Sequence, residues 1–233
     1  MRQIELIAYL KQYPLFSAIT LQNKLGKSKA YCNLVLYRWQ QQKLIFRIER
    51  NKYTVHQDPF LIASRLVWPS YISGRSALQY YHLSDQVPHE ITVVVTKPKK
   101  NLLFCNTLIR FTVTKPAHFF GYRKIKYPEQ EIFIASPEKA LIDSELLGKV
   151  SVAEIKEILT SHLSELHLAA LIIYLIRINS SSVLKRFGYL LELMGKDYHQ
   201  RFQKYCDATL IFLDPTRSHQ GLKNQKWRLI INA

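Results

Sequence analysis

The first 56 residues carry the pattern that most restricts the fold of this chain. Apolar residues at helical spacing predict three helices, from Ile4 to near Pro14, from Leu21 to Leu25 behind a Thr20 cap, and from Ser28 to about Lys43. Gly26 suits the left-handed end of the second helix. Two alternating segments within 44–55 then flank Arg50-Asn51, which suits a tight hairpin turn because Asn tolerates positive φ. This order of elements is that of a winged helix-turn-helix.

The third predicted helix has two distinct faces. One carries an apolar stripe at spacings of three and four residues, made of Cys32, Val35, Leu36 and Trp39. The other carries Lys29, Asn33 and Tyr37, each four residues apart. Since a helix fits the major groove of DNA, these polar side chains would reach base edges and phosphates. A protein-docking role for the same module stays open, because winged helices also serve in that way.

Basic residues are concentrated in two blocks. The chain has 33 Lys and Arg against 17 Asp and Glu, which gives a formal net charge of +16. Half of that charge lies in residues 1–56, and the other large contribution comes from residues 97–126, where no acidic residue occurs. Two basic blocks, of which the first holds only Glu5 and Glu49 and the second no acid, favour a polyanionic partner.

We therefore predict a surface for double-stranded DNA that draws on both blocks. The first block contributes the groups on the third helix and the hairpin, namely Lys27, Ser28, Lys29, Asn33, Tyr37, Arg47, Arg50 and Lys52. The second contributes a strip of cations on the rest of the chain, namely Lys97, Lys99, Lys100, Arg123, Lys124 and Lys126.

Asp58-Pro59 marks a predicted domain boundary, with Asp58 as a helix cap and Pro59 at the first helical position. Residues 1–57 would form the DNA-binding domain and residues 58–233 the second domain. Strands are predicted over residues 91–95, 102–104, 108–113, 132–135 and 227–232. Helices are predicted over residues 59–67, 74–81, 168–176 and 183–194, and from Pro137 and Ser151 onward. Strands first and helices after predict an α+β second domain.

Three finer expectations concern the helices of the second domain. Ser151 with Glu154 reads as a capping box. The apolar run 168–176 reads as a buried helix, and the helix 183–194 as one whose polar face holds Lys185 and Arg186.

The sequence shows no pattern of a catalytic, metal or cofactor site. Cys32, Cys105 and Cys206 lie far apart and make no CxxC pair, which argues against disulfides and a zinc finger. No HExxH, Walker, GxGxxG or GxSxG pattern occurs. The nine-residue run 168–176 is well short of the roughly 20 residues that span a membrane. We expect a cytoplasmic protein without a membrane partner, a cofactor or enzymatic activity.

Five segments of the second predicted domain form a recognisable set in their order and spacing: 71–78, 81–83, 119–122, 134–143 and 184–188. Together with the predicted winged helix, they resemble the AbiEi-type antitoxins, transcriptional regulators of bacteriophage abortive-infection systems. The resemblance implies repression of the protein's own operon through inverted or direct repeats in its promoter. It also implies neutralisation of a co-encoded nucleotidyltransferase-like toxin, without necessarily a stable complex, as in type IV toxin–antitoxin systems.

Two other functions stay open from the sequence. A nucleic-acid-processing enzyme or enzyme subunit would use the winged helix as a targeting module, although residues 91–128 hold no acid for a nuclease-type carboxylate cluster. A protein-docking adaptor would use the apolar helix 183–194.

Overall fold

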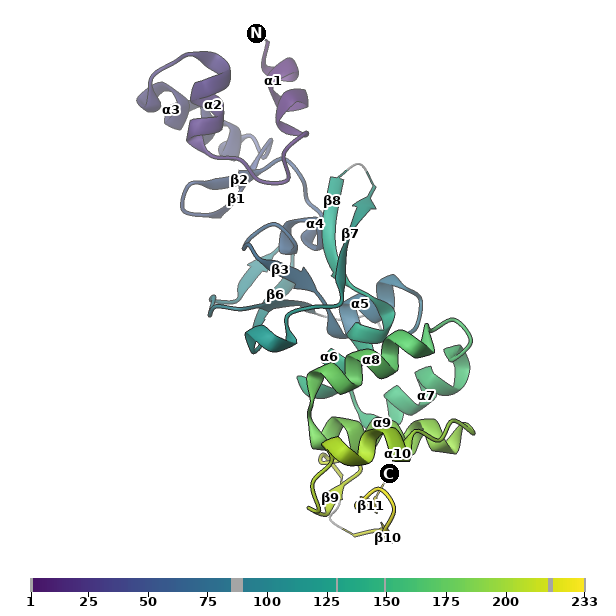
Figure 1. Cartoon of the computed structure of the whole chain (residues 1–233). Helices are drawn as coiled ribbons and strands as arrows, with labels where there is room; N and C mark the ends of the chain where they lie inside the picture. Colours follow the sequence, from purple (N-terminus) through teal and green to yellow (C-terminus); the bar gives the residue numbers. More distant parts are fainter. Residues whose placement is uncertain (1, 85–89, 129, 149, 218–219, 233) are drawn as a thin grey trace.

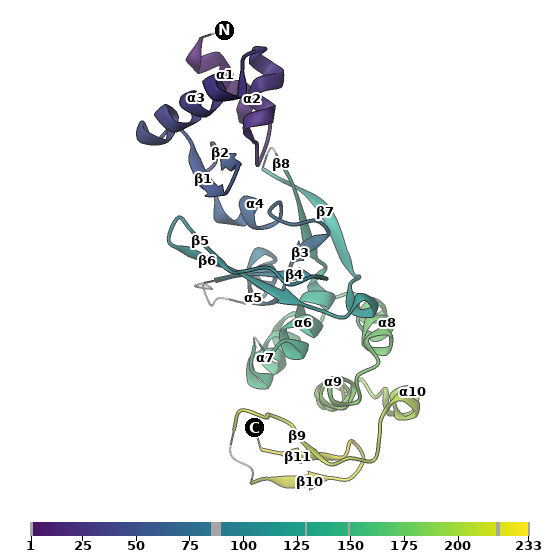
Figure 2. The same ribbon diagram turned by 90° about the vertical axis from the view of Figure 1, so that its left-hand side faces the viewer.

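The elements of the chain follow one another from one end of an elongated molecule to the other (Figures 1 and 2). The computed structural model describes residues 2–84, 90–128, 130–148, 150–217 and 220–232. Helices and a short hairpin lie at the N-terminal end, a mixed sheet lies in the middle, and helices with a small sheet lie at the C-terminal end. The protein is therefore a mixed α+β chain.

The N-terminal helices pack around a core of their own. They are α1 (Gln3–Leu10), α2 (Ala18–Leu25) and α3 (Lys29–Gln41). Their buried side chains are Leu6, Leu10, Phe16, Ala18, Leu21, Cys32, Leu36, Trp39 and Ile45. Gly26 ends α2 in the left-handed region with φ of 63°, and the Ser28 hydroxyl accepts a 3.3 Å hydrogen bond from the Tyr31 amide, both as predicted.

The predicted start of α2 is wrong by three residues. Ser17 is the N-cap, and Thr20 lies inside the first turn, where its hydroxyl accepts a hydrogen bond from the Ser17 amide at 3.2 Å. The Ser17 side chain in turn faces the Thr20 amide, so the two residues form a capping box. This box satisfies the amides of Ser17 and Thr20, which a helix starting after a Thr20 cap would leave without these partners. Sequence alone favours Thr20 because it directly precedes the apolar run.

The hairpin consists of β1 (Phe46–Glu49) and β2 (Lys52–Thr54) and turns at Arg50-Asn51, as predicted, with Asn51 at φ of 58°. Its second strand also pairs with the loop between α1 and α2, because Phe16 and Tyr53 exchange two backbone hydrogen bonds of 2.9 Å. The three helices and the hairpin are therefore one packed unit.

Six strands of the described chain form the central sheet, in the order β5-β6-β4-β3-β8-β7. They are β3 (Ser70–Ile72), β4 (Glu90–Val95), β5 (Leu102–Phe104), β6 (Thr107–Val113), β7 (Tyr122–Tyr127) and β8 (Gln130–Ala135). β4 with β6 and β3 with β8 pair in parallel, and the other neighbours are antiparallel. β3 and β7 are absent from the predicted strands, because they are too short or too basic to show a strand pattern.

Most of the remaining helices lie on the side of the sheet toward the C-terminus (Figure 1). The helical elements after the hairpin are α4 (Pro59–Ala63), α5 (Gly74–Tyr80), the 3₁₀ turn η1 (Pro116–His118), α6 (Pro137–Leu146), α7 (Val152–His162), α8 (Leu168–Ile178), α9 (Ser181–Leu193), α10 (His199–Phe202) and η2 (Gln203–Tyr205). A small sheet of β9 (Ile211–Phe212), β10 (Leu222–Asn224) and β11 (Leu229–Ile231) closes the chain in the order β10-β11-β9. α4 ends four residues earlier than predicted, and Trp227 precedes the last strand instead of belonging to it.

Expectations for three later helices need correction. Ser151 does cap α7, but the Glu154 carboxylate binds Arg75, with 2.6 Å between Oε2 and Nη2, instead of completing a capping box. α8 is half-buried, with Ile173 55% exposed. Lys185 is buried and not on a polar face: its ammonium donates to Asp207 Oδ1 and to the Thr209 carbonyl, both at 2.7 Å. Periodicity could not reveal a partner 22 residues away.

A buried ion pair joins α6 to β3 and to the start of α5. Lys139 pairs with Asp143 one turn later, and the two side chains are 0% and 2% exposed. Asp143 Oδ2 also accepts hydrogen bonds from Ser73 Oγ at 2.7 Å and Tyr71 Oη at 3.1 Å. Burial raises the pKa of Asp143 and lowers the pKa of Lys139. Each charge therefore depends on the other for its stability in this interior.

Candidate nucleic-acid interface

One face of α3 is held in the core and the opposite face is open. Cys32, Leu36 and Trp39 are buried, whereas Lys29, Asn33 and Tyr37 are exposed, as the spacing predicted. At about 100° per residue, however, the side chains directly opposite the buried stripe are Ala30, Leu34, Tyr37 and Gln41. Leu34 is 46% exposed. It is missing from the predicted site because that site was chosen from the polar residues of the helix and not from the positions that lie opposite its buried stripe.

The start of α3 is positively charged and accessible. Lys27 and Lys29 are exposed, and no carboxylate in the described residues pairs with either. Ser28 uses its oxygen to cap the helix, which leaves its hydroxyl hydrogen to donate. A phosphate group would meet two ammonium groups and the free amides of the first helical turn here.

The three predicted hairpin cations differ in their surroundings. Arg47 and Arg50 are exposed and have no acidic partner in the part of the chain that the structure describes. Lys52, by contrast, binds Glu49 at 3.1 Å and donates to the Leu66 carbonyl at 3.0 Å. Lys52 therefore attaches the hairpin to the segment before β3 and is not free for a ligand.

Glu49 joins the hairpin to the loop between β4 and β5. Its carboxylate accepts from Lys52 and from Lys99, and the Phe46 ring meets the Phe104 ring edge-on at 6.3 Å. Lys99 is therefore a structural residue, contrary to its predicted role. The junction nevertheless places Lys97 and Lys100, which are exposed on the same loop, beside the hairpin.

The remaining predicted cations lie elsewhere. Arg123, Lys124 and Lys126 belong to β7, at the opposite edge of the sheet from β5. The Lys124 ammonium lies 2.8 Å from a Glu131 oxygen, and the Arg123 guanidinium lies 5.8 Å from the centre of the Tyr81 ring. Lys126 is exposed. The fold therefore does not form one continuous strip from the block 97–126.

Glu49 supplies a pH-dependent contact. Burial disfavours its charge, but hydrogen bonds from Lys99 and Lys52 outweigh burial and hold the pKa of the carboxyl below its ordinary value. A depressed pKa of this kind stabilises the folded state wherever the carboxyl is ionised.

Replacing Glu49 by Gln is expected to lower the free energy of unfolding at neutral pH by no more than about 1 kcal/mol, since the pair is partly solvated. The contribution of Glu49 is fully present above the ordinary value of 4.5 and is lost as the pH falls through the lower folded-state pKa. Urea unfolding at a series of pH values should show wild type and variant converging in acid. Lys97→Gln, on the same loop, is the control. A difference independent of pH would refute the assignment.

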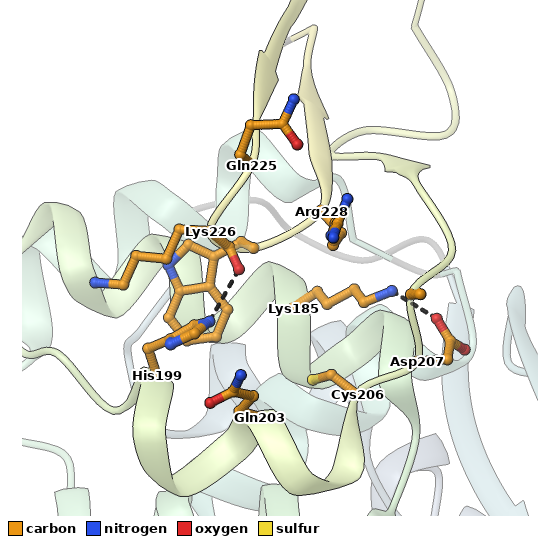
Figure 3. Close-up of a pocket in the computed structure, with 10 residues that line it drawn as sticks. Lys185, His199, Gln203, Cys206, Asp207, Gln225, Lys226 and Arg228 are labelled. Carbon is orange, nitrogen blue, oxygen red and sulfur yellow. Dashed lines mark hydrogen bonds and ion pairs between the residues drawn. The ribbon is translucent and has the colours of Figure 1, made fainter.

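A cavity of about 450 Å³ lies at the other end of the molecule, between α9, α10 and the small sheet (Figure 3). Its polar groups are largely engaged: Lys185 binds Asp207, and a His199 ring nitrogen lies 2.9 Å from the Lys226 carbonyl. Burial raises the pKa of the Cys206 thiol, which keeps it protonated and a poor nucleophile. This arrangement resembles structural packing more than a catalytic centre.

Two further features of the described residues bear on other classes of function. No group of three or more His, Cys, Asp or Glu side chains in these residues could hold a metal ion. None of the helices formed by these residues is long and apolar enough to cross a bilayer.

Comparisons with known proteins show similarity in structure only. No protein-family model matches the sequence, and no curated protein matches it. Among solved structures, the crystal structure of the Rv2827c protein from Mycobacterium tuberculosis aligns with a TM-score of 0.59, over 97% of this chain and 89% of that chain. The two chains share a fold. With 11% sequence identity, the likeness concerns the course of the backbone and assigns no activity.

Proposed function

We propose that this protein is a DNA-binding transcriptional repressor of its own operon. The observation that carries the proposal is the outward face of α3, flanked by cations that no acid in the described residues neutralises. In this proposal residues 1–57 are a winged helix-turn-helix domain, α3 is the recognition helix and the β1–β2 hairpin is the wing. Residues 58–233 form the second domain.

Each group has a distinct part in binding a duplex. The amides at the start of α3, with Lys27 and Lys29, would hold a phosphate and fix the helix in the major groove. Arg47 and Arg50 on the wing would contact the backbone beside it. Lys97 and Lys100 would extend the contact beyond the first domain, because the Glu49 junction brings their loop to the wing.

We further propose that the protein acts as antitoxin to a nucleotidyltransferase-like toxin encoded beside it, with or without a stable complex. This part rests on the five segments that resemble AbiEi-type antitoxins. Several of their residues, such as Tyr71, Lys139 and Gly188, are buried and pack the second domain. The direct test is co-expression with the product of the neighbouring reading frame: rescue of growth supports antagonism, and continued arrest contradicts it.

Binding to the upstream region of the protein's own gene should weaken steeply with salt, because each phosphate contact releases counterions. Lys27→Ala with Lys29→Ala should lower the slope of log K against log salt by about 2 and the affinity by roughly tenfold. Lys97→Ala with Lys100→Ala should act in the same direction. Lys99 is left intact because it binds Glu49. Fluorescence anisotropy with the full chain measures both quantities.

The matched control is Lys156→Ala with Lys196→Ala, two exposed lysines on α7 and after α9. This double variant removes the same charge but should leave the slope nearly unchanged. Equal losses of affinity in all three double variants would show that the protein's net charge, and not contacts made by these particular lysines, accounts for the effect. Binding that does not respond to salt would remove the DNA proposal altogether.

A further inference from the structure

The outward face of α3 is exposed and apolar from Ala30 to Tyr37, and it turns polar only at its end, where Gln41 lies. Leu34 and Tyr37 are 46% and 59% exposed there, and Ala30 lies one turn before Leu34. Exposed helix faces normally carry charged and polar side chains. This face therefore needs an explanation beyond solubility.

The cations of α3 border the centre of this face instead of occupying it. About the helix axis, Lys29 lies on one side of the line through Ala30, Leu34 and Tyr37, and Arg38 lies on the other. A helix placed in a major groove in this orientation would direct its cations to the two phosphate backbones and its apolar centre to the base edges. Leu34 and Tyr37 differ in height by about 4.5 Å, close to one base-pair step of about 3.4 Å.

The four base pairs differ in what they offer such a surface. Thymine alone presents a methyl group in the major groove, and adenine presents the donor and acceptor pair that an Asn or Gln amide matches. Guanine is matched best by Arg or Lys. The centre of α3 offers apolar groups, with the amides of Asn33 and Gln41 beside them, and no cation.

We infer that α3 selects A·T base pairs, with Leu34 and Tyr37 packing on thymine methyl groups and Asn33 binding adenine. The inference rests on the proposed DNA-binding function and adds the class of base that is read. The rival explanation for an exposed apolar face, a protein partner, makes no distinction between thymine and uracil, so the two can be separated.

The experiment begins with selection of bound duplexes from a random library by the full chain. The selected duplex is then made with thymine and with uracil, which differ only by the methyl group. Burial of one methyl group changes an equilibrium constant about fourfold. We expect A·T pairs at the core of the selected site and roughly fourfold weaker binding of the uracil duplex for each contacted methyl.

Leu34→Ala gives the decisive comparison, because alanine preserves the helix. The variant should bind the thymine duplex about fourfold more weakly and should discriminate less between thymine and uracil. Leu222→Ala, which removes the same atoms from a side chain 82% exposed on β10, should change neither affinity.

The outcomes separate the two levels of the proposal. A selected core of G·C pairs, or equal affinity for the thymine and uracil duplexes, would overturn the base assignment while leaving DNA binding intact. Failure to enrich any sequence, together with no salt-dependent binding of the upstream region, would remove the proposed function itself.

Discussion

Replacing Asp143 by Asn is expected to lower the free energy of unfolding by about 3–5 kcal/mol, because it leaves the buried ammonium of Lys139 without a counter-charge. The side chain of Lys139 is 0% exposed and cannot reach water without repacking. The amide oxygen of the variant can still accept from Tyr71 and Ser73. Its amide nitrogen then faces the Lys139 ammonium in place of the oxygen that accepts from it, so the loss combines the missing counter-charge with the missing Lys139 hydrogen bond. Urea unfolding followed by circular dichroism measures it.

A second substitution tests this explanation. Adding Lys139→Met to Asp143→Asn removes the unpaired charge, fills similar space and should restore much of the lost stability. Asp197→Asn removes a carboxylate from an exposed pair with Lys226 and should cost far less than Asp143→Asn, because solvent screens the exposed pair. An Asp143→Asn protein as stable as wild type would show that Lys139 and Asp143 are not both ionised in the folded protein.

Gly188→Ala is expected to destabilise the protein by about 2–3 kcal/mol, although alanine favours helices more than glycine does. A Cβ at this position of α9 would overlap with ring atoms of Trp227. The indole is buried against the helix backbone and is held by Glu192 through its ring N–H, so it cannot move aside freely. Thermal and urea unfolding should both show the loss.

Gly26→Ala separates this steric effect from the general cost of changing a glycine. Gly26 has φ of 63°, and a Cβ there would meet nothing within 4 Å, so only backbone strain of roughly 1 kcal/mol is expected. If Gly188→Ala lowers the free energy of unfolding no more than Gly26→Ala does, the Trp227 ring moves aside at little cost. The close packing of the ring on α9 then contributes little to stability.

Local signals predicted the N-terminal part of the fold well. The Gly26 helix end, the Ser28 cap and the Arg50-Asn51 turn depend on residues next to each other in sequence, and the structure confirms all three. The errors have a different origin. Burial of Lys185 depends on Asp207, and β3 is a strand because β4 and β8 lie on either side of it. Contacts between distant segments leave no periodic trace.

The same distinction applies to the candidate interface. The polar stripe on α3 follows from helical spacing, and its exposure is confirmed. The second basic block misleads because its partners lie outside it: Glu49, Glu90 and Glu131 pair with Lys99, Arg110 and Lys124. A count of charges along the sequence includes these cations, although only folding shows which of them remain available.

Contacts at separate points attach the N-terminal unit to the central sheet. Two of them are the Glu49 junction and a 3.0 Å hydrogen bond from Gln130 Nε2 to the Lys11 carbonyl. Contacts at two separate points restrict rotation of the N-terminal unit relative to the sheet more than a single contact would. If the proposed repressor binds repeated sites through α3, these contacts would set the angle between the duplex and the rest of the molecule, and with it the spacing of the repeats.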